Sequence, residues 1–494
     1  MKGALSIIGL DLDLVGKLTP EKQAVLKFRM QCVSPDEGKY GEDADSLRPY
    51  LSEDAEWRGC AFVQKILIET RAEFGQATPQ QVKEVEEALS RFDPANASLL
   101  EKRVTHHDQL AVLAELGRYV PVSTLALLHP GTTSYDPLDT VRSYLLKKAW
   151  VEVMLPEIKK SVAGTLDFAG RTGDLLQVGR THLQNTSPVL LSGVFAAYAA
   201  RMAERAERCK EAFGRLKGKI SGIVGTGASV DMIVGLGKSI EFERRVLEKL
   251  GLEPDYTASQ IVQKEALADV GNQLSTFSLV AADFANAVRM MYASAIGEVY
   301  SLDTSKRLGG SSADAAKDNP INWENVAGKT AVIVGGIGVL YAMITSDFQR
   351  DLRGSVQARY QPRIMMTELF ESLRRLNWAL PQLQANKHKL EENLIPVRKN
   401  PSEAMVAILR GEGWTHSTYG VGHDFVKEMS KKVKATGRPL LDVAREDPEF
   451  NRLYEGIDPV KQQVLQGNFE GYMESARTRR DINVKNATEA LERL

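Results

Sequence analysis

The sequence has little cysteine and no excess of charge of either sign. Its three cysteines, Cys32, Cys60 and Cys209, lie far apart among 494 residues, which excludes a disulfide scaffold and a cysteine-rich zinc module. Lys and Arg number 63 and Asp and Glu 64, so the net charge is -1 and nothing global favours nucleic acid or an anionic membrane. We expect a reduced, cytoplasmic protein with no nucleic-acid or membrane partner, while a local basic pocket for a phosphate stays open.

Long apolar runs are missing as well. The longest, residues 331–344, is shorter than the roughly 20 residues that a membrane span needs. It predicts a buried helix whose Gly335, Gly336 and Gly338 allow close contact with a neighbouring helix. Near the start of the chain, the apolar residues 4–10 are followed by acidic residues before the core of a signal peptide forms, so we expect no targeting segment.

Helical patterns dominate what is present. The composition, 43% hydrophobic and 26% charged, supports a sizeable core. Four stretches rich in Ala, Leu, Glu, Lys and Met carry apolar residues at three- and four-residue spacing, which predicts long helices: residues 138–171, 188–216, 263–296 and 327–346. A helix of about 30 residues is about 45 Å long. We therefore expect a helical bundle that is shared between subunits.

Helix starts are also marked in the sequence. Thr19, Thr78 and Asp458 each precede a proline, and Thr78 begins a capping box with Gln81. Alternation with a period of two is rare, which argues against a sheet-based fold. We predict an all-α fold with a long central helical bundle. Its three predicted helical domains are residues 1–128, 129–378 and 379–494.

Two segments that resemble phosphate- or metal-binding motifs do not support such a site. Gly235 to Ser239 resembles the end of a P-loop, but Met232 stands where that motif needs its first glycine. His106 and His107 are adjacent, but no pair of histidines at helical metal-binding spacing accompanies them. We expect neither a metal ion nor an organic cofactor.

Three polar segments in the middle of the chain carry the residue types of acid–base chemistry. Residues 308–320 contain two serines, a lysine and an asparagine among glycines, before a helical stretch. Taken alone, this segment would predict a flexible connector. Residues 129–136, with the sequence His-Pro-Gly-Thr-Thr-Ser-Tyr-Asp, and residues 179–188, with Thr181, His182 and Gln184, accompany it.

The three segments resemble motifs of the fumarase/aspartase/argininosuccinate lyase superfamily. The superfamily signature is Gly-Ser-Ser-x-Met-Pro-x-Lys-x-Asn-Pro, which residues 310–320 match except that Asp314 and Ala315 replace Met-Pro. The other two segments resemble the superfamily's His-x-Gly-x-Thr-Ser-x-Asp and Thr-His-x-Gln motifs, with Tyr135 as a small departure. They occur in the order that the superfamily has.

Within the superfamily, the chain is most similar to the adenylosuccinate lyase branch. Residues 34–41, Ser-Pro-Asp-Glu-Gly-Lys-Tyr-Gly, resemble that branch's Ser-Pro-x-x-Gly-Arg-Tyr-Gly, with Lys39 in place of the arginine. Residues 105–108 resemble its His-Asp motif, and residues 350–359 its Arg-Asp-Leu-x-x-Ser-x-x-x-Arg segment. Gln260 lies in a segment similar to the branch's Thr-Gln-Ile.

The resemblance implies β-elimination of fumarate from adenylosuccinate, giving AMP, and from the succinyl-aminoimidazole-carboxamide ribotide of purine biosynthesis. It makes Ser311 the base and His182 the acid, while Lys317 and Asn319 face the carboxylate that takes up the developing charge. His107 contacts the substrate phosphate or supports His182. The implied substrate-binding residues are Lys39, Tyr40, Asp108, Thr133, Ser134, Asp136, Thr181, Gln184, Gln260, Ser312, Arg350, Ser355 and Arg359. The resemblance also implies a homotetramer whose active sites combine three subunits.

Two alternatives stay open because Asp314 adds negative charge to a loop that must meet an anionic substrate. A like charge at about 5 Å costs about 3 kcal/mol at an effective dielectric constant near 20. The enzyme could split a different N-substituted aspartate. The chain could also be a structural homologue that has lost turnover.

Overall fold

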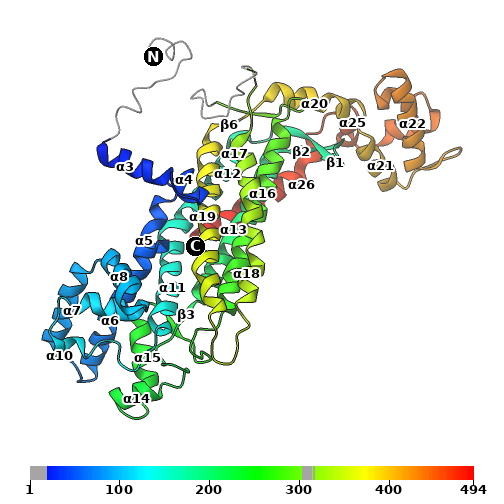
Figure 1. The fold of residues 1–494 in the computed structure, drawn as a ribbon. Coiled ribbons are helices and arrows are strands. Elements are labelled where there is room, and N and C mark those ends of the chain that lie inside the picture. Colours follow the sequence, from blue (N-terminus) through cyan, green and yellow to red (C-terminus); the bar gives the residue numbers. More distant parts are fainter. Residues whose placement is uncertain (1–18, 303–313, 315–316) are drawn as a thin grey trace, which may run out of the picture. The chain divides into compact units, whose positions relative to one another are not determined.

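The chain is mostly helical, as its periodicity predicts. The structure, a computed structural model, describes residues 19–302, 314 and 317–494. Its residues fall into two compact units, which are described separately (Figure 1). Unit 1 contains the described residues up to Met154 together with Ala212–Leu274 and Val332–Arg374. Unit 2 contains Leu155–Glu211, the described part of Ser275–Ala331, and Arg375–Leu494.

Unit 1 is built from helices of four to 21 residues and two very short strands. Its helices are α3 (Pro20–Arg29), α4 (Pro35–Gly38), α5 (Arg48–Leu51), α6 (Glu53–Glu73), α7 (Pro79–Arg91), α8 (Pro94–Leu100), α9 (Asp108–Leu116), α10 (Val122–Leu125), α11 (Tyr135–Ala149), α14 (Ala228–Val234), α15 (Ser239–Glu248) and α18 (Ile337–Ala342). A 3₁₀ turn covers Asp45–Leu47, π-helical turns cover Glu101–Thr105 and Trp150–Met154, and strands β3 (Lys217–Gly218) and β4 (Glu253–Pro254) pair in parallel.

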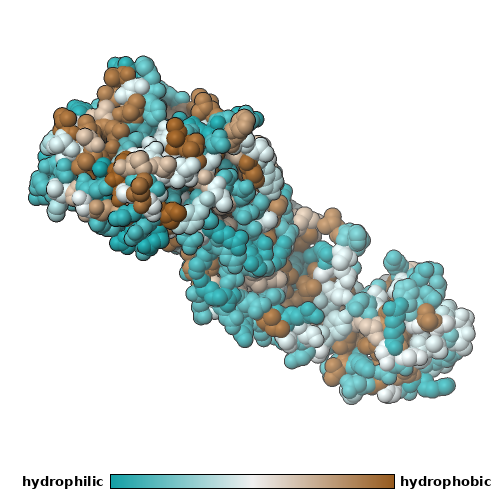
Figure 2. Space-filling view, turned by 90° about the horizontal axis from the view of Figure 1, so that it is seen from below, coloured by the Kyte–Doolittle hydropathy of each residue, from teal (hydrophilic) through white to brown (hydrophobic). Residues whose placement is uncertain are grey.

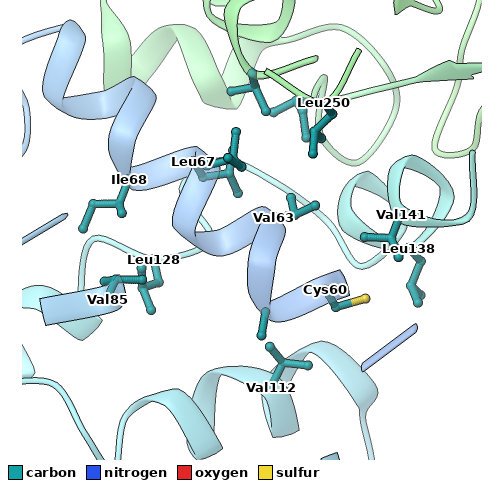
Figure 3. Packing of buried hydrophobic residues seen from close by; sticks show 14 of the residues in the cluster. Cys60, Val63, Leu67, Ile68, Val85, Val112, Leu128, Leu138, Val141 and Leu250 are labelled. Carbon is teal, nitrogen blue, oxygen red and sulfur yellow. The ribbon is translucent and has the colours of Figure 1, made fainter. Parts of the chain in front are cut away.

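The core of unit 1 surrounds α6. Val63, Leu67 and Ile68 of this helix are fully buried against residues of α7, α9 and α11, such as Val112 and Val141 (Figure 3). Capping also follows the sequence, because Thr78 and Gln81 form the predicted capping box at the start of α7. This core carries the loops of the site described below.

Unit 2 combines helices with three antiparallel pairs of short strands. Its helices are α12 (Leu155–Thr172), α20 (Lys387–Lys399), α21 (Ser402–Gly411), α22 (Gly422–Thr436), α23 (Leu440–Ala444), α24 (Pro448–Gly456), α25 (Pro459–Leu465) and α26 (Glu474–Arg493), with 3₁₀ turns at Leu380–Gln382 and Gly471–Met473. Its antiparallel strand pairs are β1 (Leu176–Thr181) with β2 (Gln184–Leu190), β5 (Val299–Ser301) with β6 (Leu383–Ala385), and β7 (Thr415–His416) with β8 (Gly420–Val421).

Four helices have residues in both units: α13 (Leu191–Gly214), α16 (Glu265–Tyr292), α17 (Ile321–Gly335) and α19 (Arg353–Ala379). Helices α13, α16 and α17 lie in or overlap three of the stretches predicted to be long helices, whereas α19 was not among them. The fourth predicted stretch, residues 138–171, is divided between α11, a π-helical turn and α12. The expected helix at residues 188–216 begins only at Leu191, because residues 184–190 pair with β1 instead. Strand pairing depends on a partner segment, which a local periodicity does not reveal.

The apolar stretch near residue 340 is less buried than expected. Helices α17 and α18 together form Ile321–Ala342, which by length and composition alone could cross a membrane, a test that core helices of soluble proteins also pass. Only 33% of its most apolar window is buried within the chain, and Val332 and Tyr341 are about half exposed. The predicted close helix contact does occur, since a Cβ added at Gly336 would lie 1.8 Å from Nε2 of Gln361.

Candidate active site

A buried ion pair fixes the loop of residues 129–136. Asp136, at the start of α11, and Lys219 are both fully buried and form a salt bridge. The Asp136 carboxylate also accepts hydrogen bonds from the backbone N–H groups of Thr133 at 2.6 Å, Ser221 at 3.0 Å and Gly222 at 3.3 Å. The sequence predicts Asp136 to bind substrate, whereas the structure turns its carboxylate towards the protein. Lys219, which orders the same loop, was not predicted.

A glycine-rich segment that the sequence analysis missed packs beside this loop. In residues 221–227, Gly225 adopts a φ of +78°, and a Cβ there would lie 2.2 Å from the carbonyl oxygen of Ala258. Gly131, with a φ of +64°, would bring a Cβ to 2.9 Å from the backbone of Ser229 and Val230. Only glycine allows these backbones to approach so closely. The sequence signal for this segment was the presence of three glycines within its seven residues.

Arg350 and Gln260, far apart in the sequence, meet in unit 1. An Nη1–H of Arg350 donates to Oε1 of Gln260 at 2.8 Å, and the guanidinium lies 3.9 Å from the centre of the Tyr135 ring. The neighbouring hydroxyl of Ser259 donates to the carbonyl of Gln349 at 2.6 Å. The structure thus brings together three of the predicted segments, and Tyr135, a departure from the family pattern, supplies a cation–π contact.

His107 and Ser134 also lie side by side. Nε2 of His107 is 3.2 Å from the Ser134 hydroxyl, while Nδ1 caps the first turn of α9 at 3.4 Å from the backbone N–H of Leu110. The His107 side chain is 43% exposed, so its ring is accessible to a ligand. The adjacent carboxylate of Asp108 accepts from the backbone N–H of Gln109 at 2.6 Å.

His129 has a structural place in the same loop. Its backbone N–H donates to Oε1 of the fully buried Gln64 at 2.8 Å, and its Nδ1 is 3.1 Å from Nε2 of the same amide. Burial, together with the smaller effect of the nearby His107, lowers the pKa of His129 to about 4. His129 is therefore neutral at neutral pH and orients the loop.

Two cavities of unit 1 meet at Arg359. The larger, of about 480 Å³, is lined by Ser34, Asp36 and Glu37 of the N-terminal motif and by residues of α19 that include Arg359. The smaller, of about 240 Å³, is lined by Arg359 and by Asp108 of the His-Asp motif. Segments that lie about 300 residues apart in the sequence thus share one region, as the resemblance implies.

Arg48 holds the N-terminal motif in place. Its guanidinium donates to both carboxylate oxygens of Glu37, at 3.1 and 2.8 Å, and to the carbonyl of Gly41 at 3.2 Å. Between these anchors, Lys39 is exposed at the end of α4 and Tyr40 is half-buried. Ser355 lies on the first turn of α19 and is half-buried as well.

The predicted acid, His182, lies at the tip of a β-hairpin in unit 2. Thr181 pairs with Gln184 across a two-residue turn in which His182 and Leu183 have φ values of +52° and +58°. Such turns normally use Asn-Gly, and a left-handed conformation costs a residue other than glycine about 1–2 kcal/mol. All four residues are exposed, so the imidazole is held at a strained and accessible position.

A fully buried carboxylate, Glu298, anchors this hairpin. It accepts hydrogen bonds from both Nη atoms of Arg180, at 3.0 and 2.7 Å, from Gln177 at 2.6 Å and from Asn393 at 2.9 Å. Strand β5 follows it directly and leads towards the signature segment. Glu298 was not predicted, because its burial depends on partners from distant segments.

The signature segment is described only at its end. Ser311 and Ser312 lie outside the described residues. Lys317 is exposed and Asn319 half-buried, both directly before α17, and the backbone N–H of Lys317 donates to the carbonyl of Asp314 at 3.3 Å. Asp314 is exposed. His182, Lys317 and Asn319 thus belong to unit 2, whereas the predicted residues around Arg350 belong to unit 1. In the described part of the chain, no group of His, Cys, Asp and Glu residues could hold a metal ion.

Glu243 makes the stability of the site region sensitive to pH. It is 4% exposed, accepts from the backbone N–H of Ile220 at 2.6 Å, and burial raises its pKa from 4.5 to about 7. A raised pKa in the folded state means that its contribution is fully present below about pH 4.5 and is lost as the pH rises through 7. Glu243→Gln is expected to remove this loss, of about 3 kcal/mol.

Thermal unfolding of both proteins at pH 5 and pH 8 tests this prediction. At pH 8, the melting temperature of the wild type should be lower than that of Glu243→Gln. Glu241→Gln, at an exposed position of the same helix, is the matched control and should behave like the wild type. Equal pH dependence of Glu243→Gln and the wild type would contradict the role assigned to Glu243.

The amino-acid sequence is similar to those of known lyases. A family model described as lyase matches residues 52–335. The adenylosuccinate lyase of Methanocaldococcus jannaschii is 27% identical over 434 residues, which cover 87% of this chain and 89% of that protein. The adenylosuccinate lyase of Bacillus subtilis is 31% identical over 298 residues, covering 60% of this chain and 66% of that protein.

Solved structures agree with the fold. A 3-carboxy-cis,cis-muconate lactonizing enzyme from Pseudomonas putida has a TM-score of 0.75 at 19% identity, covering 90% of this chain and 97% of that one. A fumarate lyase from Mesorhizobium sp. BNC1 has a TM-score of 0.76 at 19% identity, covering 89% and 97%. The all-α, long-helix fold expected from the sequence is confirmed.

Proposed function

Because the chain belongs to the lyase family whose model matches residues 52–335, we propose that it releases fumarate from adenylosuccinate, giving AMP. It also acts on the succinyl-aminoimidazole-carboxamide ribotide of purine biosynthesis. The observation that carries the proposal is the meeting of Arg350 with Gln260 and Tyr135, and of Arg359 with the N-terminal motif. The segments of Arg350, Arg359, Gln260 and the N-terminal motif resemble the adenylosuccinate lyase branch, and the segment of Tyr135 resembles the superfamily. The similarity to adenylosuccinate lyases supports the same substrate.

The reaction is an elimination of a succinyl group. Ser311 takes the proton from the carbon beside a carboxylate, the electron pair left behind forms the carbon–carbon double bond, and the bond to nitrogen breaks. Lys317 and Asn319 stabilise the extra negative charge on that carboxylate. His182 gives a proton to the departing nitrogen, so fumarate and a neutral amine result.

The nucleotide half of the substrate lies in unit 1. Arg350, Ser355 and Arg359 present two guanidinium groups and a hydroxyl, which suit a phosphate and ribose. Lys39 adds a positive charge next to the larger cavity, and His107 with Ser134 offers further donors. Asp136 orders the loop on which Ser134 and Tyr135 lie.

The active enzyme is a cytoplasmic homotetramer. Exposed apolar residues on the long helices, among them Leu279, Met290, Val332 and Tyr341, leave surface that neighbouring subunits would bury. Figure 2 shows hydrophobic groups scattered among hydrophilic ones on one face of the molecule. The family resemblance implies that each active site combines segments from three subunits.

A fumarate assay tests the function. The purified protein should release fumarate from adenylosuccinate, followed by absorbance, and Ser311→Ala should lower kcat by about 100- to 10,000-fold, the usual contribution of a general base. Ser305→Ala, just before the signature segment and outside any family motif, is the control and should retain activity. Turnover only of a succinyl-amine without phosphate would instead support a different N-substituted aspartate as substrate, and no turnover of any candidate would support a structural role.

A further inference from the structure

The smaller cavity of unit 1 contains a buried amide oxygen without a partner. Gln109, in the first turn of α9, is 1% exposed. Its Nε2 donates to Sγ of Cys60 at 3.4 Å, whereas its Oε1 has no hydrogen-bond partner in the described part of the chain. A buried acceptor left unpaired costs about 1–3 kcal/mol. Such a cost is offset when a ligand supplies the missing donor.

The walls of this cavity also favour a ligand that donates hydrogen bonds. Its lining holds four carboxylates and two cations: Glu53, Glu56, Glu101, Asp108, Lys102 and Arg359. Two of the carboxylates are already paired outside the cavity lining, since Arg363 contacts Glu53 at 2.9 Å and Glu56 at 2.5 Å. The other two carboxylates, Glu101 and Asp108, are matched in number by Lys102 and Arg359, so the Gln109 oxygen remains as the acceptor that a donor on a ligand can reach.

The size and lining of the cavity suit a planar ring. Trp57 is one of its lining residues, and an indole is a partner on which a planar heterocycle stacks. Its volume of about 240 Å³ lies below the roughly 300–1,000 Å³ of ordinary ligand pockets, so it accommodates one part of a larger substrate. The adjoining cavity of about 480 Å³, which shares Arg359 and Glu53, has room for the rest.

We propose that Gln109 is a specificity-determining residue that accepts a hydrogen bond from an N–H group on the substrate's nitrogen heterocycle. The ligand class is a planar ring with an exocyclic N–H donor, such as an aminopurine. Adenine carries an amino group where hypoxanthine carries a carbonyl oxygen, and a carbonyl would leave two acceptors facing each other. The inference rests on the proposed function and adds the part of the substrate that this cavity recognises.

Binding of the product nucleotide tests the inference without turnover. By titration calorimetry, the wild type should bind AMP about tenfold or more tightly than IMP, the factor expected for one hydrogen bond of about 1.4 kcal/mol. Gln109→Met, which replaces the amide with an apolar group of similar length, should bind AMP and IMP equally. Gln80→Met is the matched control, because Gln80 is exposed on α7 and donates a hydrogen bond to Glu84, and it should keep the preference. An unchanged preference in Gln109→Met would overturn the inference.

A ligand series on the wild type alone covers the case in which Gln109→Met does not fold. N6-methyl-AMP keeps one N–H donor and should bind like AMP, whereas N6,N6-dimethyl-AMP has none and should bind about tenfold or more weakly. Equal binding of the two analogues would overturn the inference. A wild type that prefers AMP but releases no fumarate would reject the proposed reaction and support the role of Gln109. Fumarate release with equal binding of AMP and IMP would reject Gln109 alone.

Discussion

Replacement of His182 with alanine is expected to lower kcat for fumarate release by about 100- to 10,000-fold, with a smaller change in KM. Without a proton donor, the departing nitrogen leaves as an unstable anion, so the loss falls on the chemical step. The imidazole lies on an exposed turn whose two residues both have positive φ values, and Glu298 anchors the strand that precedes it. A position of this kind is retained at functional sites because the surrounding structure compensates for its strain.

Steady-state kinetics of fumarate release measures this effect. His388→Ala is the control, because His388 lies on α20 with a side chain that is 86% exposed, and it should leave kcat unchanged. If His182→Ala retained kcat while His107→Ala lost it, the acid would be His107. A further variant, Glu298→Gln, weakens the anchor of the hairpin and so tests the positioning of His182.

Replacement of Asp136 with alanine is expected to lower the free energy of unfolding by about 3–5 kcal/mol. The substitution leaves the ammonium group of Lys219 fully buried without its counter-charge. It also removes the acceptor of three backbone N–H groups in two loops of the site. The double substitution Asp136→Leu with Lys219→Met removes both charges and should recover much of the loss, because two apolar groups carry no desolvation cost.

Urea denaturation at one fixed protein concentration measures these free energies, since the stability of an oligomer depends on concentration. Asp167→Ala is the control: its pair with Arg171 lies on the surface of α12, with side chains 63% and 35% exposed, and should be worth less than about 0.5 kcal/mol. A loss below 1 kcal/mol for Asp136→Ala would show that the buried pair does not support the loop.

Local features of the fold could be predicted well. Periodicity placed the long helices, and the caps at Thr78 and Asp458 begin α7 and α25 as expected. The hairpin of β1 and β2 was missed, because each strand is stable only against the other. The apolar stretch at residues 331–344 was expected to be buried, yet much of it is exposed, since hydrophobicity alone does not state which surface covers it.

The sequence predicted residues of the candidate site, but it did not predict the buried residues that hold them in place. The resemblance to the adenylosuccinate lyase branch pointed to Gln260 and Arg350, and the structure joins them by a hydrogen bond. Nothing in the sequence marked Lys219, Glu298 or Gln109, which are ordinary polar residues until their burial is known. Their roles follow from partners that lie 80 to 120 residues away or, for Gln109, 49 residues away.

The amino-acid sequence by itself determined the helical architecture and the set of reactive side chains, because helix formation and motif spacing depend on near neighbours along the chain. Only the tertiary structure decided which polar groups are buried, which loops touch, and where a cavity with an unpaired acceptor opens. Those properties arise from segments that are distant in the sequence and meet in space. Exclusion of water there makes each hydrogen bond and charge pair electrostatically stronger than on the surface.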